Sequence, residues 1–218
     1  TPYWRETKDQ HHITLVAGIS AACTSIRPML ISTRKKLDDD LEKTFFFKWG
    51  SYAYTSKGYM TQEVLIQWIE NNLAPYVYSI RQCIHGANKC VVIADGCTSH
   101  YGNEIKDALE KIGNIRIIYL PPHSSHISQM LDASLFSALK RKYSSITKDN
   151  SLISKFTQKM MKIKKAYQTS VTEELIKSSW EATGFKLEIY NGIVVKYEFS
   201  NDFKVKLRNE ASHTEFNQ

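Results

Sequence analysis

The chain has few cysteines and no long apolar run. These two features argue against a disulfide-rich protein and against a membrane-spanning one. Its four cysteines show neither a C-x-x-C pair nor a metal-ligand spacing, which argues against a disulfide scaffold and favours reduced thiols. A zinc site made of Cys90, Cys97 and His100 is an alternative. No apolar stretch approaches the ~18 residues that a membrane span needs, and no secretory signal opens the sequence. We therefore expect a protein that is neither secreted nor embedded in a membrane.

The sequence also lacks internal repeats and low-complexity linkers. A length of 218 residues suits one α/β domain, and the 42% hydrophobic content favours a globular chain over a disordered one. We therefore predict a single domain over residues 1–218. The first residue is Thr1 rather than Met, which we interpret as a sign that the chain is a piece of a longer protein.

Acidic residues are in the minority, and the net charge of +7 is unevenly distributed. Between residues 133 and 170, nine basic residues stand against Asp149 alone. Such a stripe can neutralise phosphates and release counterions from a nucleic acid. The alternative is the solvated face of two lysine-rich helices. The basic residues that we predict to bind nucleic acid are Lys140, Arg141, Lys162, Lys164 and Lys165.

The N-terminal part predicts strands followed by a helix. Residues 12–22 and 25–32 have the pattern of two strands joined by a short turn, and the aromatic-rich range 45–54 is also expected to be extended. The acids of residues 38–40 predict a solvated loop rather than a metal site, because successive side chains point in different directions. Thr61 suits the N-cap of a helix. The apolar residues on one face of that helix are Val64, Leu65, Trp68, Ile69 and Leu73.

Residues 90–120 predict a parallel strand–helix–strand unit. Range 90–95 is apolar up to Asp95, which is typical of a strand covered on both faces. A helix over 103–112 and a strand over 115–120 follow it. In open sheets of this kind, sites form beyond the carboxyl ends of the strands. Asp95 stands at such an end and is therefore a candidate site residue.

Asp132 lies 37 positions after Asp95, at the start of a helix expected over about residues 131–143. At 100° per residue, its side chain falls within the same arc of about 140° as the apolar residues of that helix. An ionised acid that points toward a core is costly unless it is paired or coordinates a cation. The alternative is a first-turn acid that favours the helix dipole. Two carboxylates at one end of a mixed sheet predict a divalent-metal site that acts on a phosphodiester.

The C-terminal part predicts helices near 152–165 and 172–183, with Gly184 as a stop signal. Asn191-Gly192 lies between two strand-like runs and predicts a β-hairpin. We expect residues 146–218 to form an elaboration on a core of about residues 12–145.

Two stretches resemble the catalytic domain of pogo/Tigger-type DDE transposases, a group within the mariner-like superfamily. They are IADGCTSH, residues 93–100, and IRIIYLPPHSSHISQMLDASLFSALKRKY, residues 115–143. The resemblance covers about residues 12–185 and implies an RNase H-like fold, with a mixed central sheet flanked by helices. The chain departs from the family pattern at Gly96, where Asn is usual, and at Met130, where Pro is usual.

The resemblance implies a nuclear transposase or endonuclease with DNA as its partner and no membrane association. It implies that Asp95 and Asp132 are the catalytic residues and bind Mg²⁺ or Mn²⁺. His100 and His126 are candidates for phosphate contact, or else ordinary polar residues. The family's remaining carboxylate, on the first strand of the sheet, is not visible in this sequence, and we expect it upstream of Thr1.

The resemblance leaves two alternatives to an active transposase. One is a domesticated, catalytically silent DNA-binding protein on the same fold. The other is an RNase H-like nuclease that acts on RNA or hybrids. A homodimer is one option for the assembly of any of the three.

Overall fold

A computed structural model describes residues 12–38, 49–83, 89–94, 102–120, 130–147, 154–190 and 193–199. Its strands are β1 (Ile13–Ile19), β2 (Ser25–Ser32), β3 (Ser51–Tyr54), β4 (Cys90–Ala94), β5 (Ile115–Tyr119), β6 (Phe185–Tyr190) and β7 (Ile193–Phe199). Its helices are α3 (Gln62–Trp68), α4 (Ala74–Cys83), α5 (Asn103–Ile112), α7 (Phe136–Ser145), α8 (Lys155–Ser170) and α9 (Glu173–Ala182). Two π-helical segments are η2 (Ile69–Leu73) and η4 (Leu131–Leu135).

Strands β1, β2 and β3 form one sheet, in which β1 is antiparallel to β2 and β2 is parallel to β3. The predicted strands over 12–22 and 25–32 are confirmed, and β1 is shorter than expected because the chain turns after Ile19. The Ser20 N–H donates to the Thr24 carbonyl at 2.8 Å, and Cys23 has a φ of 58° within this turn. Within the described part of 45–54, the extended segment is β3.

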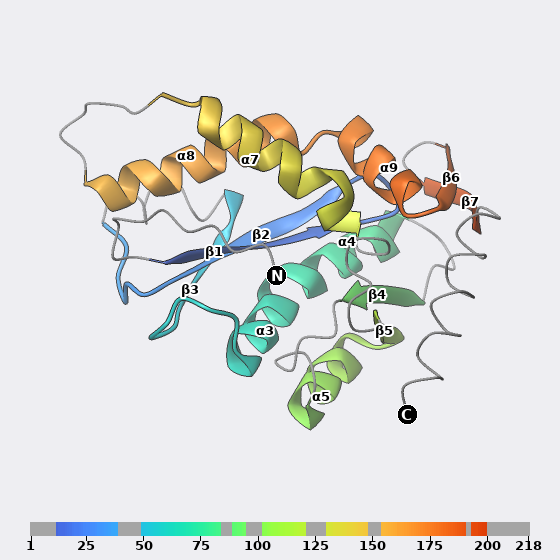
Figure 1. Ribbon diagram of the computed structural model, residues 1–218. Coiled ribbons are helices and arrows are strands. Elements are labelled where there is room, and N and C mark those ends of the chain that lie inside the picture. Colours follow the sequence, from blue (N-terminus) through green and yellow to red (C-terminus); the bar gives the residue numbers. More distant parts are fainter. Residues whose placement is uncertain are drawn as a thin grey trace, which may run out of the picture.

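Strand β2 is the centre of the molecule. Leu30 and Ile31 are 0% exposed, and Met29 is 1% exposed. Met29 and Ile31 pack against α3, η2, α4 and α5, whereas Leu30 packs against α7 and α8. Figure 1 shows this layering, with α7 and α8 on one side of β1 and β2 and with α3 and α4 on the other. Each such fully buried side chain contributes about 1.5–3 kcal/mol of transfer free energy.

The helix predicted to begin after Thr61 is confirmed. The Thr61 side chain accepts a hydrogen bond from the Val64 N–H at 3.4 Å, as expected of an N-cap. The helix widens into the π-helical segment η2, where Asn72 is only 2% exposed. Its amide nitrogen donates to the Arg27 carbonyl at 2.8 Å, and its amide oxygen accepts from the Ser51 hydroxyl at 2.9 Å. Asn72 therefore ties the helix to β2 and β3. The predicted apolar face is buried throughout, at Val64, Leu65, Trp68, Ile69 and Leu73.

Strands β4 and β5 form a separate parallel sheet, joined through α5 as predicted. The inward face of α5 is buried, and the helix ends at Gly113, whose φ is 76°. The expectation that β4 is covered on both faces holds at Ile93 but is wrong at Val91. Val91 of β4 is 56% exposed and Ile118 of β5 is 53% exposed. Helices cover the face of this sheet that carries Val92 and Ile117, whereas its second face has Ile93 packed against the cluster of η4 and α9 but leaves Val91 and Ile118 exposed.

The C-terminal helices are present with shifted bounds, because their N-caps are Ser154 and Thr172. Gly184 stops α9 as predicted: its φ is 87° and its N–H donates to the Glu181 carbonyl at 2.9 Å. Strands β6 and β7 pair antiparallel, which confirms the predicted hairpin. No described helix has the length and apolar character to cross a membrane. The described strands form three separate sheets, so a mixed α/β architecture is confirmed but a single central sheet is not.

Candidate active site

Strand β4 is paired with β5 along its whole length, including its carboxyl end. The Leu120 N–H donates to the Ala94 carbonyl at 2.8 Å, so the ladder extends to the last residue of the strand. Asp95, the first predicted catalytic residue, lies outside the described residues. It follows Ala94 directly in the sequence, and consecutive Cα atoms are about 3.8 Å apart. Ala94 is therefore the described residue nearest in sequence to this predicted catalytic acid.

Asp132, the second predicted catalytic residue, is half-buried in η4. The helix predicted over 131–143 exists, but it begins as a π-helical segment and becomes the α-helix α7 only at Phe136. The 100° spacing is therefore wrong for its first turn, because a π-helix closes i→i+5 hydrogen bonds. Asp132 lies at the margin of the core rather than inside it. Single π-helical turns within helices are frequent at functional sites.

The segment around Asp132 is fixed from two directions. The hydroxyl oxygens of Ser134 and Ser179 are hydrogen-bonded, which ties η4 to α9. On α9, the Trp180 indole N–H donates to the Ser20 carbonyl at 3.1 Å, which links the helix to the turn after β1. Leu135 is 0% exposed and packs with Trp180 in the same cluster. The backbone that carries the half-buried Asp132 is therefore held in place by α9, which is itself bonded to the turn after β1.

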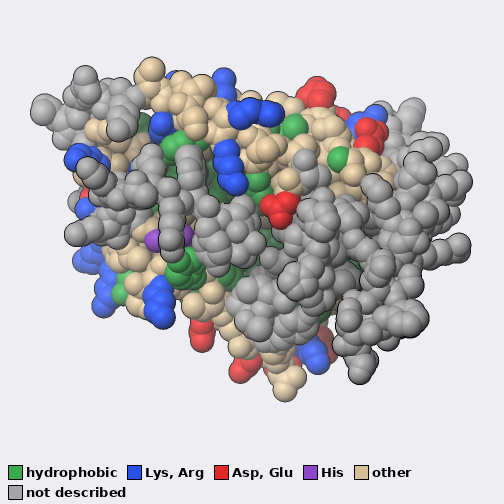
Figure 2. Space-filling model, viewed as in Figure 1, with side chains coloured by type: hydrophobic (Ala, Val, Ile, Leu, Met, Phe, Trp, Pro, Cys, Tyr) green, Lys and Arg blue, Asp and Glu red, His purple; other side chains and the backbone are tan. Residues whose placement is uncertain are grey.

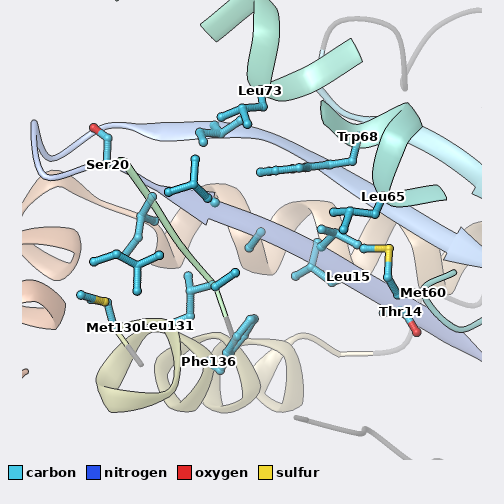
Figure 3. Close-up of a pocket in the computed structure, with 18 of the residues that line it drawn as sticks. Thr14, Leu15, Ser20, Met60, Leu65, Trp68, Leu73, Met130, Leu131 and Phe136 are labelled. Carbon is cyan, nitrogen blue, oxygen red and sulfur yellow. The ribbon is translucent and has the colours of Figure 1, made fainter. Parts of the chain in front are cut away.

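Residues at the carboxyl end of β4 and at the start of η4 line the same cavity. It has a volume of about 480 Å³, and most of its wall is apolar. Ala94 and Leu131, the residues that directly precede Asp95 and Asp132, both line it. Ile93 and Leu131 also pack against the same buried cluster. Figure 3 shows Met130, Leu131 and Phe136 on one side of this cavity, opposite Leu65, Trp68 and Leu73 on the other.

A carboxylate such as that of Asp132 is a hard oxygen donor, the type of ligand that suits a hard divalent cation. Mg²⁺ takes oxygen ligands and is commonly held by one or two carboxylates while it keeps several waters. Within the described part of the chain, no three His, Cys, Asp or Glu side chains are grouped to hold a metal ion. Asp132 is the described carboxylate at this place, and its oxygens are of the type that Mg²⁺ accepts. For the alternative zinc site, Cys97 and His100 lie outside the described residues, and burial raises the pKa of the Cys90 thiol, which disfavours the thiolate that binds zinc.

The predicted nucleic-acid-binding residues that are described lie on the neighbouring helices α7 and α8. Lys140, Arg141 and Lys165 are exposed, and Figure 2 shows Lys and Arg side chains over this layer. Lys162 is half-buried, with its Nζ 4.3 Å from the centroid of the Tyr143 ring. Burial lowers the pKa of Lys164, which is also half-buried. The predicted residues His100 and His126 lie outside the described residues.

Asp38 has a role that the sequence reasoning missed. The charge run predicted a solvated loop, but the Asp38 carboxylate accepts hydrogen bonds from the Thr157 hydroxyl and, at 2.8 Å, from the Ser154 hydroxyl. These two hydrogen bonds, together with the charge of Arg34, hold the pKa of Asp38 below its usual value. The carboxylate thus anchors the N-terminus of α8. No local sequence signal could reveal it, because its partners lie more than 110 positions away.

Comparison with known proteins agrees with this arrangement of elements. In the described residues, β4 ends directly before one predicted acid and η4 begins beside the other, with basic side chains on the neighbouring helices α7 and α8. The family model described as DDE superfamily endonuclease matches residues 11–183, and the chain belongs to this family. The resemblance to a DDE-type catalytic domain is therefore confirmed.

The chain is also similar to a protein whose name is that of a transporter. The chain is 31% identical over 186 residues to a protein named MFS-type transporter clz9 from Cochliobolus lunatus. The match covers 82% of this chain but 19% of that protein, so the chain spans about a fifth of the relative's length. No solved structure matches the chain.

Proposed function

We propose that the chain is the catalytic part of an enzyme that cuts DNA strands and joins them, and that Asp95 and Asp132 hold its divalent cations. One observation carries the proposal: Ala94 and Leu131, the chain neighbours of the two acids, line the same cavity. Membership of an endonuclease family supports the same reading of the site. A pogo/Tigger-type transposase is the particular member that the sequence pattern favours.

The cations would be Mg²⁺ or Mn²⁺. When bound as a pair, such ions activate an attacking water or 3′-hydroxyl and stabilise the leaving oxygen of a phosphodiester. Asp95 would supply the ligand at the end of β4, and Asp132 the ligand at the start of η4. The apolar wall beside them excludes water from one side, which strengthens electrostatic interactions within the site.

DNA would lie along α7 and α8. Lys140 is exposed on α7 and also lines the cavity, so it connects the basic layer to the proposed reaction centre. Arg141 and Lys165 extend the positive surface away from it. Such contacts bind phosphate without sequence preference and are weakened by salt. A nuclear location and a homodimeric assembly complete the proposal.

Catalysis is tested in a longer protein that carries the upstream segment in which we expect the remaining carboxylate. We expect Mg²⁺- or Mn²⁺-dependent nicking of supercoiled plasmid by that protein and little or none by the 218 residues alone. Asp95→Asn and Asp132→Asn should each reduce nicking to background while DNA binding persists, because each removes a ligand but no basic side chain. Asp107→Asn, an exposed acid on α5, is the matched control and should cut normally.

Two results would contradict this proposal. Nicking that persists in both Asn variants would show that these acids are not catalytic. DNA binding without nicking by the unmodified longer protein would instead support the silent, domesticated alternative.

A further inference from the structure

Strands β1, β2 and β3 are aligned at one end of their sheet. Ile13, the first residue of β1, pairs with Ser32 at the end of β2, and Ser32 pairs with Tyr54 at the end of β3. The segments that precede β1, follow β2 and follow β3 therefore emerge together. We call this surface the sheet end, and it comprises His12, residues 33–36 and residues 54–59.

The turn after β3 is held against β1 and β2 by several hydrogen bonds. The Thr55 N–H donates to the Ser32 carbonyl at 3.1 Å, and the Gly58 N–H donates to the Thr55 carbonyl at 3.2 Å. The Thr14 hydroxyl donates to the Gly58 carbonyl at 2.7 Å. Gly58 has a φ of 71°, and a Cβ at this position would come within 2.8 Å of the His12 carbonyl oxygen, so the turn requires glycine.

Aromatic rings are exposed on both sides of this turn. Tyr54 is 40% exposed and Tyr59 is 39% exposed. The Tyr59 and His12 rings have centroids 4.5 Å apart and an interplanar angle of 45°. The Thr55 hydroxyl donates to the Tyr59 carbonyl at 3.0 Å, which brings the two ends of the turn together. Exposed aromatic rings are surfaces on which nucleobases stack with little regard to their sequence.

The sheet end is also positively charged. Lys35, Lys36 and Lys57 are exposed, and the Lys35 Nζ lies 5.6 Å from the centroid of the Tyr54 ring. Asp38, the described acid nearest in sequence to Lys35 and Lys36, is held by hydrogen bonds at the N-terminus of α8. Figure 2 shows Lys and Arg side chains at this end of the molecule, to the left of the view. Basic side chains and aromatic rings thus alternate on one surface.

We propose that the sheet end binds a short stretch of single-stranded nucleic acid. The lysines contact phosphates, and Tyr54 and the pair of Tyr59 and His12 each stack on a base. Basic side chains alone would suit any polyanion. The exposed rings beside them favour a single strand, because the bases of a duplex are already stacked on one another and are not free to stack on protein. This surface consists of other residues than the basic side chains of α7 and α8, and the inference does not depend on the proposed catalysis.

The test uses the 218-residue chain and a fluorescein-labelled oligothymidylate of about 12 nucleotides, within the ~4–16 nucleotides that single-stranded sites cover. Tyr54→Leu and Tyr59→Leu each remove a ring but keep an apolar side chain. Each should weaken binding about fivefold or more in fluorescence anisotropy. Tyr54→Phe and Tyr59→Phe keep the ring and should bind as the unmodified chain does. Tyr78→Leu on α4 removes a tyrosine that is 45% exposed, and this matched control should also bind normally.

A duplex of the same length separates stacking from charge. The two Tyr→Leu variants should bind the duplex as the unmodified chain does, because its bases are not available to the rings. Replacement of Lys35, Lys36 and Lys57 by Gln should weaken binding of the single strand. It should also reduce the slope of log affinity against log salt by roughly 0.7 for each lost phosphate contact.

Several results would overturn the proposal. Equal single-strand affinity of the Leu variants, the Phe variants and the unmodified chain would show that no base stacks on these rings. An equal loss of affinity for duplex and single strand would show that the Leu variants act through the fold. Equal competition by polyglutamate would identify a surface for any polyanion. Absence of oligothymidylate binding by the unmodified chain at low salt would also overturn it.

Discussion

Strands β2 and β4 are both apolar, yet their surroundings are opposite. β2 has a strand on each side and helices over both faces, and its central side chains are fully buried. β4 has one described strand partner, and Val91 on its second face is exposed. Local stability in proteins follows buried contacts, and functional segments are drawn from the less stable regions. We infer that β2 stabilises the fold, whereas β4 carries the proposed chemistry at its carboxyl end.

The largest effect should follow the loss of a side chain in β2. Leu30→Ala removes a fully buried side chain and should lower the free energy of unfolding by about 2–5 kcal/mol. Val91→Ala in β4 is the control and should change it by less than about 0.5 kcal/mol, because that side chain is exposed. Urea unfolding followed by circular dichroism measures both. Similar losses in the two variants would contradict the division between the strands.

A smaller effect is expected at η2. Asn72→Ala removes hydrogen bonds to the Arg27 carbonyl and the Ser51 hydroxyl, and leaves these part-buried groups without that partner. The expected cost is about 1–3 kcal/mol. Asn71→Ala, one residue earlier and exposed, is the matched control. If both variants unfold at the same urea concentration, the π-helical segment does not help to hold β2 in place.

The basic layer predicts a change in DNA affinity rather than in stability. Neutralising Lys140, Arg141 and Lys165 should reduce the slope of log affinity against log salt by roughly 0.9 for each lost phosphate contact on duplex DNA. Lys177, an exposed lysine on α9 that lies 4.0 Å from Glu181, is a control for simple loss of charge. An unchanged slope in the triple variant would show that these three side chains do not contact phosphate. The basic residues of α7 and α8 would then be ordinary solvated side chains.

The smallest effect concerns pH and Asp38. Because its pKa is lowered in the folded state, Asp38 adds stability that is fully present above its ordinary pKa of 3.8 and is lost as pH falls through the folded-state value. Asp38→Asn should therefore reduce stability at neutral pH and reduce the loss of stability that occurs as pH falls below 3.8. The effect should be small because 44% of the side chain is exposed. Thermal melts of both proteins across this pH range measure it, and parallel curves would contradict the assignment.

The elements that the sequence predicted well are those with local causes. Thr61 caps its helix through a residue three positions later, and the buried face of α5 follows from helical spacing alone. Gly184 and the hairpin of β6 and β7 likewise depend on neighbouring residues. The identity of the family could be predicted because its motif segments are continuous in the sequence.

The elements that the sequence did not predict depend on distant contacts. Nothing in the run Cys90–Ala94 distinguishes a strand with two covered faces from one with an exposed Val91. The π-helical turn at Asp132 changes the angle between successive side chains, so the prediction made with 100° per residue does not apply to that turn. The separation of β1 from β4 and the anchoring of α8 by Asp38 are also tertiary features, formed by segments far apart in the chain.

The central claim is that Asp95 and Asp132 belong to one metal site. Titration of the 218-residue chain with Mn²⁺, followed by the electron paramagnetic resonance signal of the free ion, tests it most directly. Asp95→Asn and Asp132→Asn should each weaken Mn²⁺ binding about tenfold or more, which corresponds to ~1.4 kcal/mol. The double variant should lose less than the sum of the two single losses, because both acids bind the same cation. Asp107→Asn should bind as the unmodified chain does. Unchanged affinity in either single variant would contradict the shared site.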